Sequence, residues 1–216
     1  ARFELLNADL LSRIEVVRGP QSALWGSQAI GGVIAVNGVD DASGVMAQGE
    51  AGAFGFVRAS ASGAVAGERA SLAAALGWQR ASGIDSFSGD GDRDGYRNLS
   101  GRVRATWRPS EALTLGAASF AFGGRTEFDG YDPVTFNRAD TRDSSRNRLA
   151  AGRLWAEIGG DGPWRARIGA SLLGSSNRNF LAGDLLNRTR GTRATLDAQL
   201  ERAFTTGAVR HRLVLA

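Results

Sequence analysis

The feature that most limits the fold of this chain is a two-residue alternation of apolar and polar side chains that runs through most of its length. In one segment, Leu99, Val103 and Trp107 alternate with polar residues that include Arg102 and Arg104. Successive side chains of a β-strand point to opposite faces, so such a segment forms a strand with one apolar and one polar face. We expect strands near 44–53, 56–66, 70–82, 98–108, 113–123, 147–158, 164–177, 190–203 and 209–216.

The connections between these strands help to distinguish a membrane barrel from a soluble sandwich, which shows the same alternation. Short turns alternate with long loops: the turns lie at 66–69, 109–112, 159–163 and 205–208, and the loops at 83–97, 124–146 and 178–189. Outer-membrane barrels have short periplasmic turns, longer extracellular loops, a polar interior and aromatic girdles. Four tryptophans near predicted strand ends fit such girdles, namely Trp78, Trp107, Trp155 and Trp164. The pattern favours a transmembrane antiparallel barrel.

Composition excludes several other classes of protein. The sequence contains no run of the roughly 18–20 apolar residues that a membrane helix needs. It has no cysteine, a single histidine and no serine-centred nucleophile elbow, so no nucleophile–base pair indicates an enzyme. The net charge is +4 and every Lys/Arg position is arginine, yet these arginines are scattered and no basic helix or zinc pattern accompanies them. Nucleic acid is therefore not an expected partner.

A second signal precedes the first of these strands. The apolar run Ile14–Val17 is broken by Arg18-Gly19-Pro20, and a strand-like run resumes at Val33 after two glycines. From Ile14 onward the residue types read Ile-Glu-Val-Val-Arg-Gly-Pro-x-Ser and then Gly-x-x-Ala-Ile-Gly-Gly-Val-Ile. This order resembles the closing segment of the plug domain of TonB-dependent outer-membrane receptors. It departs from the family at Trp25 and Ala35, which are usually tyrosine and asparagine.

The resemblance implies an all-β protein in the outer membrane of a Gram-negative bacterium. Residues 1–40 would be the C-terminal part of a plug domain, and residues 41–216 the N-terminal part of a transmembrane antiparallel β-barrel, with eight or nine of about 22 strands. It implies contact with outer-membrane lipid, and import of a small-molecule ligand driven by the TonB–ExbB–ExbD complex through a plug segment before residue 1. Both ends of the sequence look cut, so we expect a fragment of a longer receptor.

The first long loop carries the sharpest polar cluster in the sequence. Asp90, Asp92 and Asp94 alternate and precede Gly95, and Asp85 lies shortly before them. Calcium takes six to eight oxygen ligands, and a tight glycine-rich loop lets carboxylates converge on one ion. The spacing predicts a calcium site formed by Asp85, Asp90, Asp92 and Asp94. The alternative is a solvated acidic loop that neighbouring arginines partly neutralise.

Within the family, the order of strands, loops and acids resembles the vitamin B12 transporter branch. Asp85 matches the first calcium ligand of that branch, and residues 92–96 match its Asp-x-Asp-Gly-aromatic unit. The branch also uses acids from the later loop, where only Asp184 is available here. The resemblance implies that Leu24 and Trp25 contact the corrinoid ligand, against the alternative that Trp25 is plug core.

The remaining acids form a looser set, which the sequence favours as a hydrated loop: Glu127, Asp129, Asp132, Asp140 and Asp143. The resulting hypothesis is a TonB-dependent receptor for energised uptake of cobalamin or another corrinoid, with calcium as a structural ion in an extracellular loop. The alternatives are a siderophore or haem receptor of the same family, a docking surface for colicin or phage, and an inactive truncated receptor that only binds.

Overall fold

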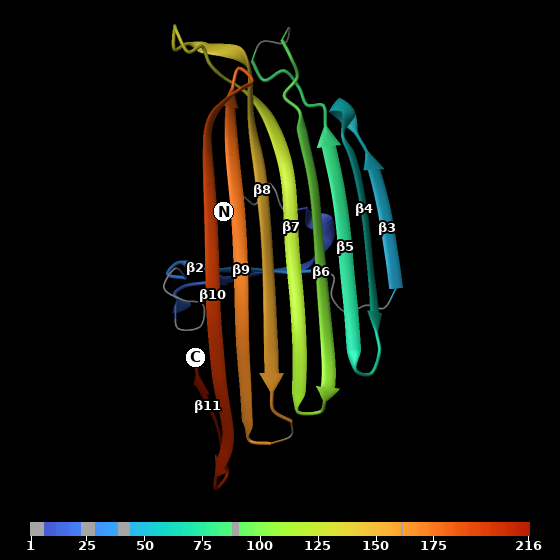
Figure 1. The fold of residues 1–216 in the computed structure, drawn as a ribbon, viewed down its shortest axis with the longest axis vertical. Helices are drawn as coiled ribbons and strands as arrows, with labels where there is room; N and C mark the ends of the chain where they lie inside the picture. Colours follow the sequence, from blue (N-terminus) through green and yellow to red (C-terminus); the bar gives the residue numbers. More distant parts are fainter. Residues whose placement is uncertain (1–6, 23–28, 39–43, 88–90, 161) are drawn as a thin grey trace.

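The computed structural model describes residues 7–22, 29–38, 44–87, 91–160 and 162–216. These residues form two parts, a two-stranded antiparallel hairpin and a nine-stranded antiparallel sheet. The hairpin lies against one face of the sheet and runs across its strands (Figure 1). The expected all-β class is confirmed.

The first described element of the N-terminal part is a short 3-10 helix. The elements of this part are η2 (Ala8–Leu10), β1 (Leu11–Arg18) and β2 (Gly32–Gly38). The two strands pair antiparallel, with Val16 opposite Ile34. Gly32 has a φ of +144°, and a β-carbon there would lie 2.4 Å from the carbonyl oxygen of Val17, so the hairpin requires glycine at this position. The predicted pair of strands on either side of the Gly-Pro turn is confirmed.

The sheet is an up-and-down meander in which each strand pairs with its neighbours in sequence. Its strands are β3 (Gly44–Ala51), β4 (Val57–Ala66), β5 (Ala70–Ala81), β6 (Tyr96–Ser110), β7 (Leu113–Tyr131), β8 (Arg138–Ile158), β9 (Trp164–Leu181), β10 (Asp184–Thr206) and β11 (Val209–Leu215). All nine predicted strands are present, and η3 (Ala53–Gly55) lies in the β3–β4 connection. The short turns lie at one end of the sheet and the long β5–β6 connection at the other (Figure 1).

Two of the three predicted long loops are wrong in extent. β7 and β8 continue into 124–146 and leave a connection at 132–137, while β9 and β10 meet in a turn at Ala182 and Gly183. Both turn residues have positive φ, 49° and 93°, as a tight hairpin turn requires. The strands extend beyond the sequence signal because the ends next to these connections are mostly polar, and the apolar residues there do not alternate, as in Leu185 and Leu186. The apolar half of the alternation is lost there, while the backbone pairing continues.

Contacts with the N-terminal part identify the inner face of the sheet. The Arg58 guanidinium lies 3.2 Å from the Asp9 carboxylate. Arg102 Nη1 donates to the carbonyl oxygen of Leu10 at 3.4 Å. The predicted polar face of the strands is therefore the one that meets the N-terminal part.

The opposite, outer face is apolar and exposed. Leu154, Leu172 and Leu196 lie on it with 65%, 59% and 85% of their surface exposed. Such a continuous apolar surface is what a barrel wall presents to lipid, and a soluble protein would cover it. The sheet is open, with β3 and β11 at its edges, so it forms part of a barrel wall. No helix among the described residues has the length and apolar character needed to cross a membrane.

One of the four predicted girdle positions is wrong. Trp155 lies on the inner face, only 9% exposed, and packs over Gly116, where a β-carbon would lie 2.1 Å from the indole ring. The guanidinium carbon of Arg104 lies 5.6 Å from the indole centroid, within cation–π range. Strand parity decides which face a side chain takes, and nearness to a strand end does not. The other three tryptophans predicted for the girdle are exposed.

We predict that an arginine introduced on the outer face destabilises the protein far more than one placed on the adjacent inner position. Leu196→Arg, in the middle of β10, is expected to lower the unfolding free energy of the full-length protein in lipid vesicles by about 2–4 kcal/mol, because the charge must enter hydrocarbon. Thr195→Arg is the matched control and should change it by about 0.5 kcal/mol or less. Urea unfolding measures both, and equal losses would contradict the assignment of the two faces.

Candidate functional site

The long β5–β6 connection closes at its neck and is tied to β7. The Asp94 amide donates to the carbonyl of Ile84 at 3.0 Å, and the Glu127 amide of β7 donates to the carbonyl of Gly95 at 2.8 Å. Gly83 has a φ of +73°, and a β-carbon there would lie 1.8 Å from the Asp94 carbonyl oxygen. These contacts fix where the carboxylates of the connection lie.

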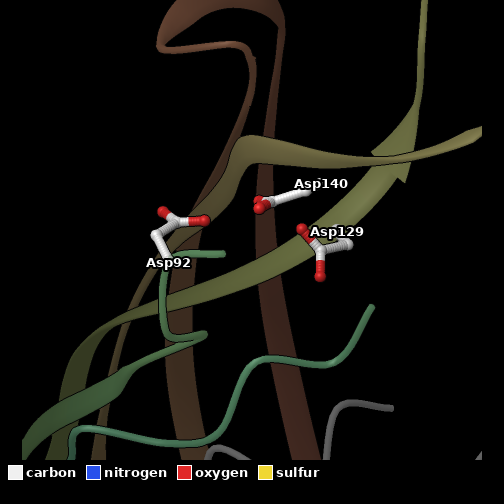
Figure 2. Close-up of side chains that lie close together, drawn as sticks. All are labelled: Asp92, Asp129 and Asp140. Atoms are coloured by element: carbon white, nitrogen blue, oxygen red, sulfur yellow. The ribbon is translucent and has the colours of Figure 1, made fainter. Parts of the chain in front are cut away.

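Three carboxylates from separate parts of the chain meet at this end of the sheet. Asp92 comes from the β5–β6 connection, Asp129 from β7 and Asp140 from β8, and one oxygen of each lies within 4.8 Å of the others. Figure 2 shows the three side chains around a common space. Asp92 and Asp140 are exposed and Asp129 is half-buried, so this acidic cluster opens to solvent.

An irregularity in the β7–β8 pairing helps to assemble the acidic cluster. The register between the two strands shifts just after Phe128, as at a β-bulge. The Thr141 amide of β8 donates to Asp129 Oδ1 at 2.9 Å, which holds that carboxylate toward β8. Asp140 lies against Gly91, where a β-carbon would be 1.7 Å from Asp140 Oδ2. The acidic cluster therefore depends on a bulge in one hairpin and a glycine in another connection.

Two of the four predicted calcium ligands hold the loop instead of joining the cluster. Asp85 accepts the amide of Phe87 on Oδ1 at 2.8 Å and the amide of Gly91 on Oδ2 at 2.6 Å. Asp94 accepts both the amide and the hydroxyl of Ser86. The oxygens of both carboxylates thus already accept hydrogen bonds from groups of their own loop.

Ser86 connects Asp94 to the acidic cluster. Its hydroxyl donates to Asp94 and also lies 2.9 Å from Asp129 Oδ2. A hydroxyl has one hydrogen to donate, so it satisfies one of these two carboxylates at a time. Burial raises the pKa of the Asp94 carboxyl, the charge of Asp129 raises it further, and the hydrogen bonds from Ser86 act in the opposite direction.

The carboxylates of the acidic cluster lie close enough to repel one another. The pKa of Asp140 is raised, first by a hydrogen bond with Asp92, then by desolvation and by the charges of Asp92, Asp129 and Asp85. Two carboxyl groups share a hydrogen bond only when one of them is protonated. Such a cluster lowers its repulsion by taking up either a proton or a cation, and oxygen ligands of this kind suit a hard cation such as calcium.

The other predicted site residues lie elsewhere. Asp90 lies outside the described residues, and so do Leu24 and Trp25, the predicted ligand contacts. Asp184 begins β10 opposite Leu181 and is not a member of the acidic cluster. Of the predicted calcium set, the structure brings Asp92 alone into the group of described carboxylates.

The sequence did not connect Asp129 and Asp140 to the loop. The looser acidic set of the sequence, to which both belong, also contains Asp132. In the β7–β8 connection Asp132 accepts the amides of Val134 at 2.9 Å and Thr135 at 2.7 Å. A turn carboxylate and two cluster members thus look alike in sequence. Recognising that β7 and β8 pair beyond their apolar parts would have placed the two acids across one hairpin.

Known proteins resemble this chain by sequence at its N-terminus and by fold along its length. Residues 1–33 match the family model of the TonB-dependent receptor plug domain. No curated protein sequence matches the chain.

Three solved structures illustrate the similarity in fold. The siderophore receptor PiuA from Acinetobacter baumannii has a TM-score of 0.71 and 16% identity, covering 95% of this chain and 34% of its own. The ferric-catecholate import receptor Fiu from E. coli K12, in its open form, has a TM-score of 0.71 and 15% identity, with coverages of 96% and 38%. The siderophore receptor PirA from Acinetobacter baumannii has a TM-score of 0.70 and 16% identity, with coverages of 99% and 35%. At these identities the likeness shows the fold, and the chain spans 34–38% of these three structures.

We predict opposite responses to acid in two neighbouring connections of the metal-free protein. A raised pKa in the folded state means that the fold binds protons more tightly than the unfolded chain does. The contribution of Asp140 to folding stability is therefore fully present below its ordinary pKa of 3.8 and is lost as pH rises through the raised pKa. Backbone hydrogen bonds from Thr135 and Val134 lower the pKa of Asp132, so its contribution is present above 3.8 and lost as pH falls through the lowered pKa.

Hydrogen exchange, corrected for the pH dependence of the chemical step, measures this difference in the full-length protein. Protection in the β5–β6 connection should fall as pH rises above 3.8, and protection in 132–137 should fall as pH drops below it. Asp140→Asn should weaken the pH dependence of the first profile, because it removes one of two carboxyls of raised pKa and leaves Asp94, and it should leave the second profile unchanged. Identical profiles for both connections would contradict this account of the charges.

Proposed function

We propose that this chain is part of a TonB-dependent receptor of the outer membrane and takes part in the energised import of a ferric siderophore. The observation that carries the proposal is one sheet with two unlike faces: the inner face contacts the N-terminal part, which matches the plug family at residues 1–33, and the outer face is apolar. A plugged barrel needs both. The siderophore is favoured because the similar solved structures are named as siderophore and ferric-catecholate receptors.

Cobalamin, the ligand that the acidic loop predicts, has less support. The resemblance to the B12 branch requires acids from the later loop at 178–189. In this chain that stretch is strand and a tight turn, and Asp184 stands at the start of β10. The siderophore alternative of the sequence analysis therefore fits the fold and the similar structures better.

The described contacts between plug and wall suit a part that must move. Asn7 and Asp9 are buried or nearly so at this interface, and Asn7 Nδ2 and Asp9 Oδ2 have no hydrogen-bond partner there. A buried unsatisfied polar atom costs about 1–3 kcal/mol. An interface of this kind is held less firmly than an apolar core, and we propose that it yields when the TonB complex pulls on the segment preceding this chain.

For the acidic cluster we propose a structural calcium ion. Asp92, Asp129 and Asp140 supply oxygens that already lie within 4.8 Å of one another. A divalent cation among them replaces repulsion by attraction and joins the β5–β6 connection to the β7–β8 hairpin. By favouring the ordered form of these loops it would improve capture of an extracellular ligand.

Transport is tested in cells that rely on the full-length receptor. We expect accumulation of a radiolabelled ferric catecholate siderophore, abolished by a protonophore because the import is energised from the inner membrane. Radiolabelled cobalamin, supplied in the same assay, should stay outside. Accumulation of cobalamin without the siderophore would restore the corrinoid alternative, and siderophore binding without accumulation would favour a receptor that only binds.

Calcium binding is tested by calorimetry on the purified full-length receptor. Asp129→Asn and Asp140→Asn should each weaken calcium binding by about tenfold or more, because each removes a charged oxygen ligand. Asp184→Asn, a carboxylate outside the acidic cluster, is the matched control and should bind as the wild type does. Unchanged affinity in both cluster variants would sink the calcium proposal.

A further inference from the structure

The strand register places an arginine at the same level on six consecutive strands. Each is directly opposite the next, in the order Arg80, Arg97, Arg125, Arg146, Arg178 and Arg188. We call these six residues the arginine belt. Residues directly opposite in neighbouring strands point to the same face of a sheet, so the arginine belt is one continuous row across β5 to β10.

The arginine belt lies on the outer face, away from the plug. Arg97 has the strand parity of Leu99, which is 51% exposed on that face, and the opposite parity to Arg102, which contacts the plug. The next row toward the middle of the sheet on the same face contains Trp78, Leu99 and Gly123. The belt therefore lies just beyond the apolar band, at its extracellular edge.

That second row carries further charge at its far end. Arg148 lies opposite Gly123, and Arg190 and Arg148 both lie opposite Ser176. Arg188 lies outside the apolar band. Its pKa is lowered first by desolvation and then by the charges of Arg178, Arg190 and Arg148. Eight arginines are thus gathered within two adjacent rows.

The protein itself does little to neutralise this charge. Among the described residues, the arginine belt makes one ion pair, between Arg125 and Glu127 at 2.9 Å. Arg146 lies over the ring of Phe180 instead, with its guanidinium carbon 4.6 Å from the centroid. Like charges directly opposite in a sheet are destabilising. A row of this kind on an exposed face therefore points to an anionic partner outside the chain.

The surface beneath the arginine belt is hollowed. Two depressions of about 360 Å³ each share Trp78, Arg97 and Arg125 in their walls. Gly123 lies in the wall of one of them, and a β-carbon there would find its nearest neighbour 3.9 Å away. Guanidinium groups on one side and apolar surface on the other suit a ligand with a charged head and a hydrocarbon tail.

We propose that the arginine belt binds the phosphate groups of the anionic glycolipid in the outer leaflet of the outer membrane. The planar guanidinium matches phosphate with two parallel hydrogen bonds, which is why arginine serves this purpose better than a point charge. The acyl chains then lie along the apolar outer face below the belt. The imported ligand is not the partner, because the belt is on the opposite side of the wall from the plug. This inference concerns the lipid around the receptor and does not depend on what is imported.

The test uses the full-length receptor in neutral detergent, titrated with bisphosphorylated lipid A and followed by native mass spectrometry. The triple variant Arg97→Gln, Arg125→Gln and Arg146→Gln should bind lipid A about a hundredfold more weakly than the wild type, because each arginine near a charged membrane surface contributes about fivefold. Lipid A stripped of its phosphates should bind the wild type as weakly as the triple variant binds the intact lipid.

Arg202→Gln is the matched control for Arg146→Gln. Arg202 also lies on the outer face and over an aromatic ring, 4.9 Å from the Trp164 centroid, but at the turn end of the sheet. The Arg202→Gln variant should leave lipid A binding unchanged.

The shift of the folded barrel on unheated gels verifies that each variant folds. Equal binding by the wild type and the triple variant overturns the proposal, as does equal loss in Arg202→Gln. Displacement of the lipid by inorganic phosphate at millimolar concentration would overturn it too, since the belt would then recognise phosphate and not the lipid.

Discussion

Inside a bilayer every backbone amide and carbonyl must find its partner within the protein, because hydrocarbon offers no hydrogen bonds. In the meander from β3 to β11, each strand between the two edge strands pairs on both sides and so meets this requirement. With the backbone paired in this way, strand parity decides where side chains lie: Leu172 and Leu196 are on the exposed apolar face, and Arg58 and Arg102 contact the N-terminal part. The inward position of Trp155 and the outward position of the arginine belt both follow from the same parity rule.

The sequence predicts a strand well where one face is apolar and the other polar, and poorly where both faces are polar. In β6, Leu99 and Val103 lie on the exposed apolar face while Arg102 contacts the N-terminal part, and this contrast is visible in the sequence as alternation. In the outer part of β8 and β9, both faces are polar, and Asn147 and Asn177 bond to one another on the inner side at 2.6 Å. Composition alone cannot distinguish such a strand segment from a hydrated loop, although its backbone pairing continues that of the rest of the strand.

The residue type of the candidate site was predictable from the sequence, and its members were only partly predictable. Alternating acids in a glycine-rich loop pointed to oxygen ligands for a cation, and Asp92 does lie in the cluster. Spacing within one loop could not reveal Asp129 and Asp140, which arrive from another hairpin through a bulge. Nor could it show that Asp85 accepts two backbone amides of its own loop. Local sequence finds carboxylates, whereas strand register decides which of them meet.

The central claim is that one face of this sheet touches lipid and the other is wet. The sequence contains no cysteine, so single cysteines can carry spin labels at successive positions from Ala166 to Leu173 of β9 in the full-length receptor. Labels at Ile168, Ala170 and Leu172 should collide with oxygen dissolved in lipid. Labels at Arg167, Gly169 and Ser171 should collide with a water-soluble nickel complex. Accessibility without a two-residue period, or with the reverse phase, would contradict the account.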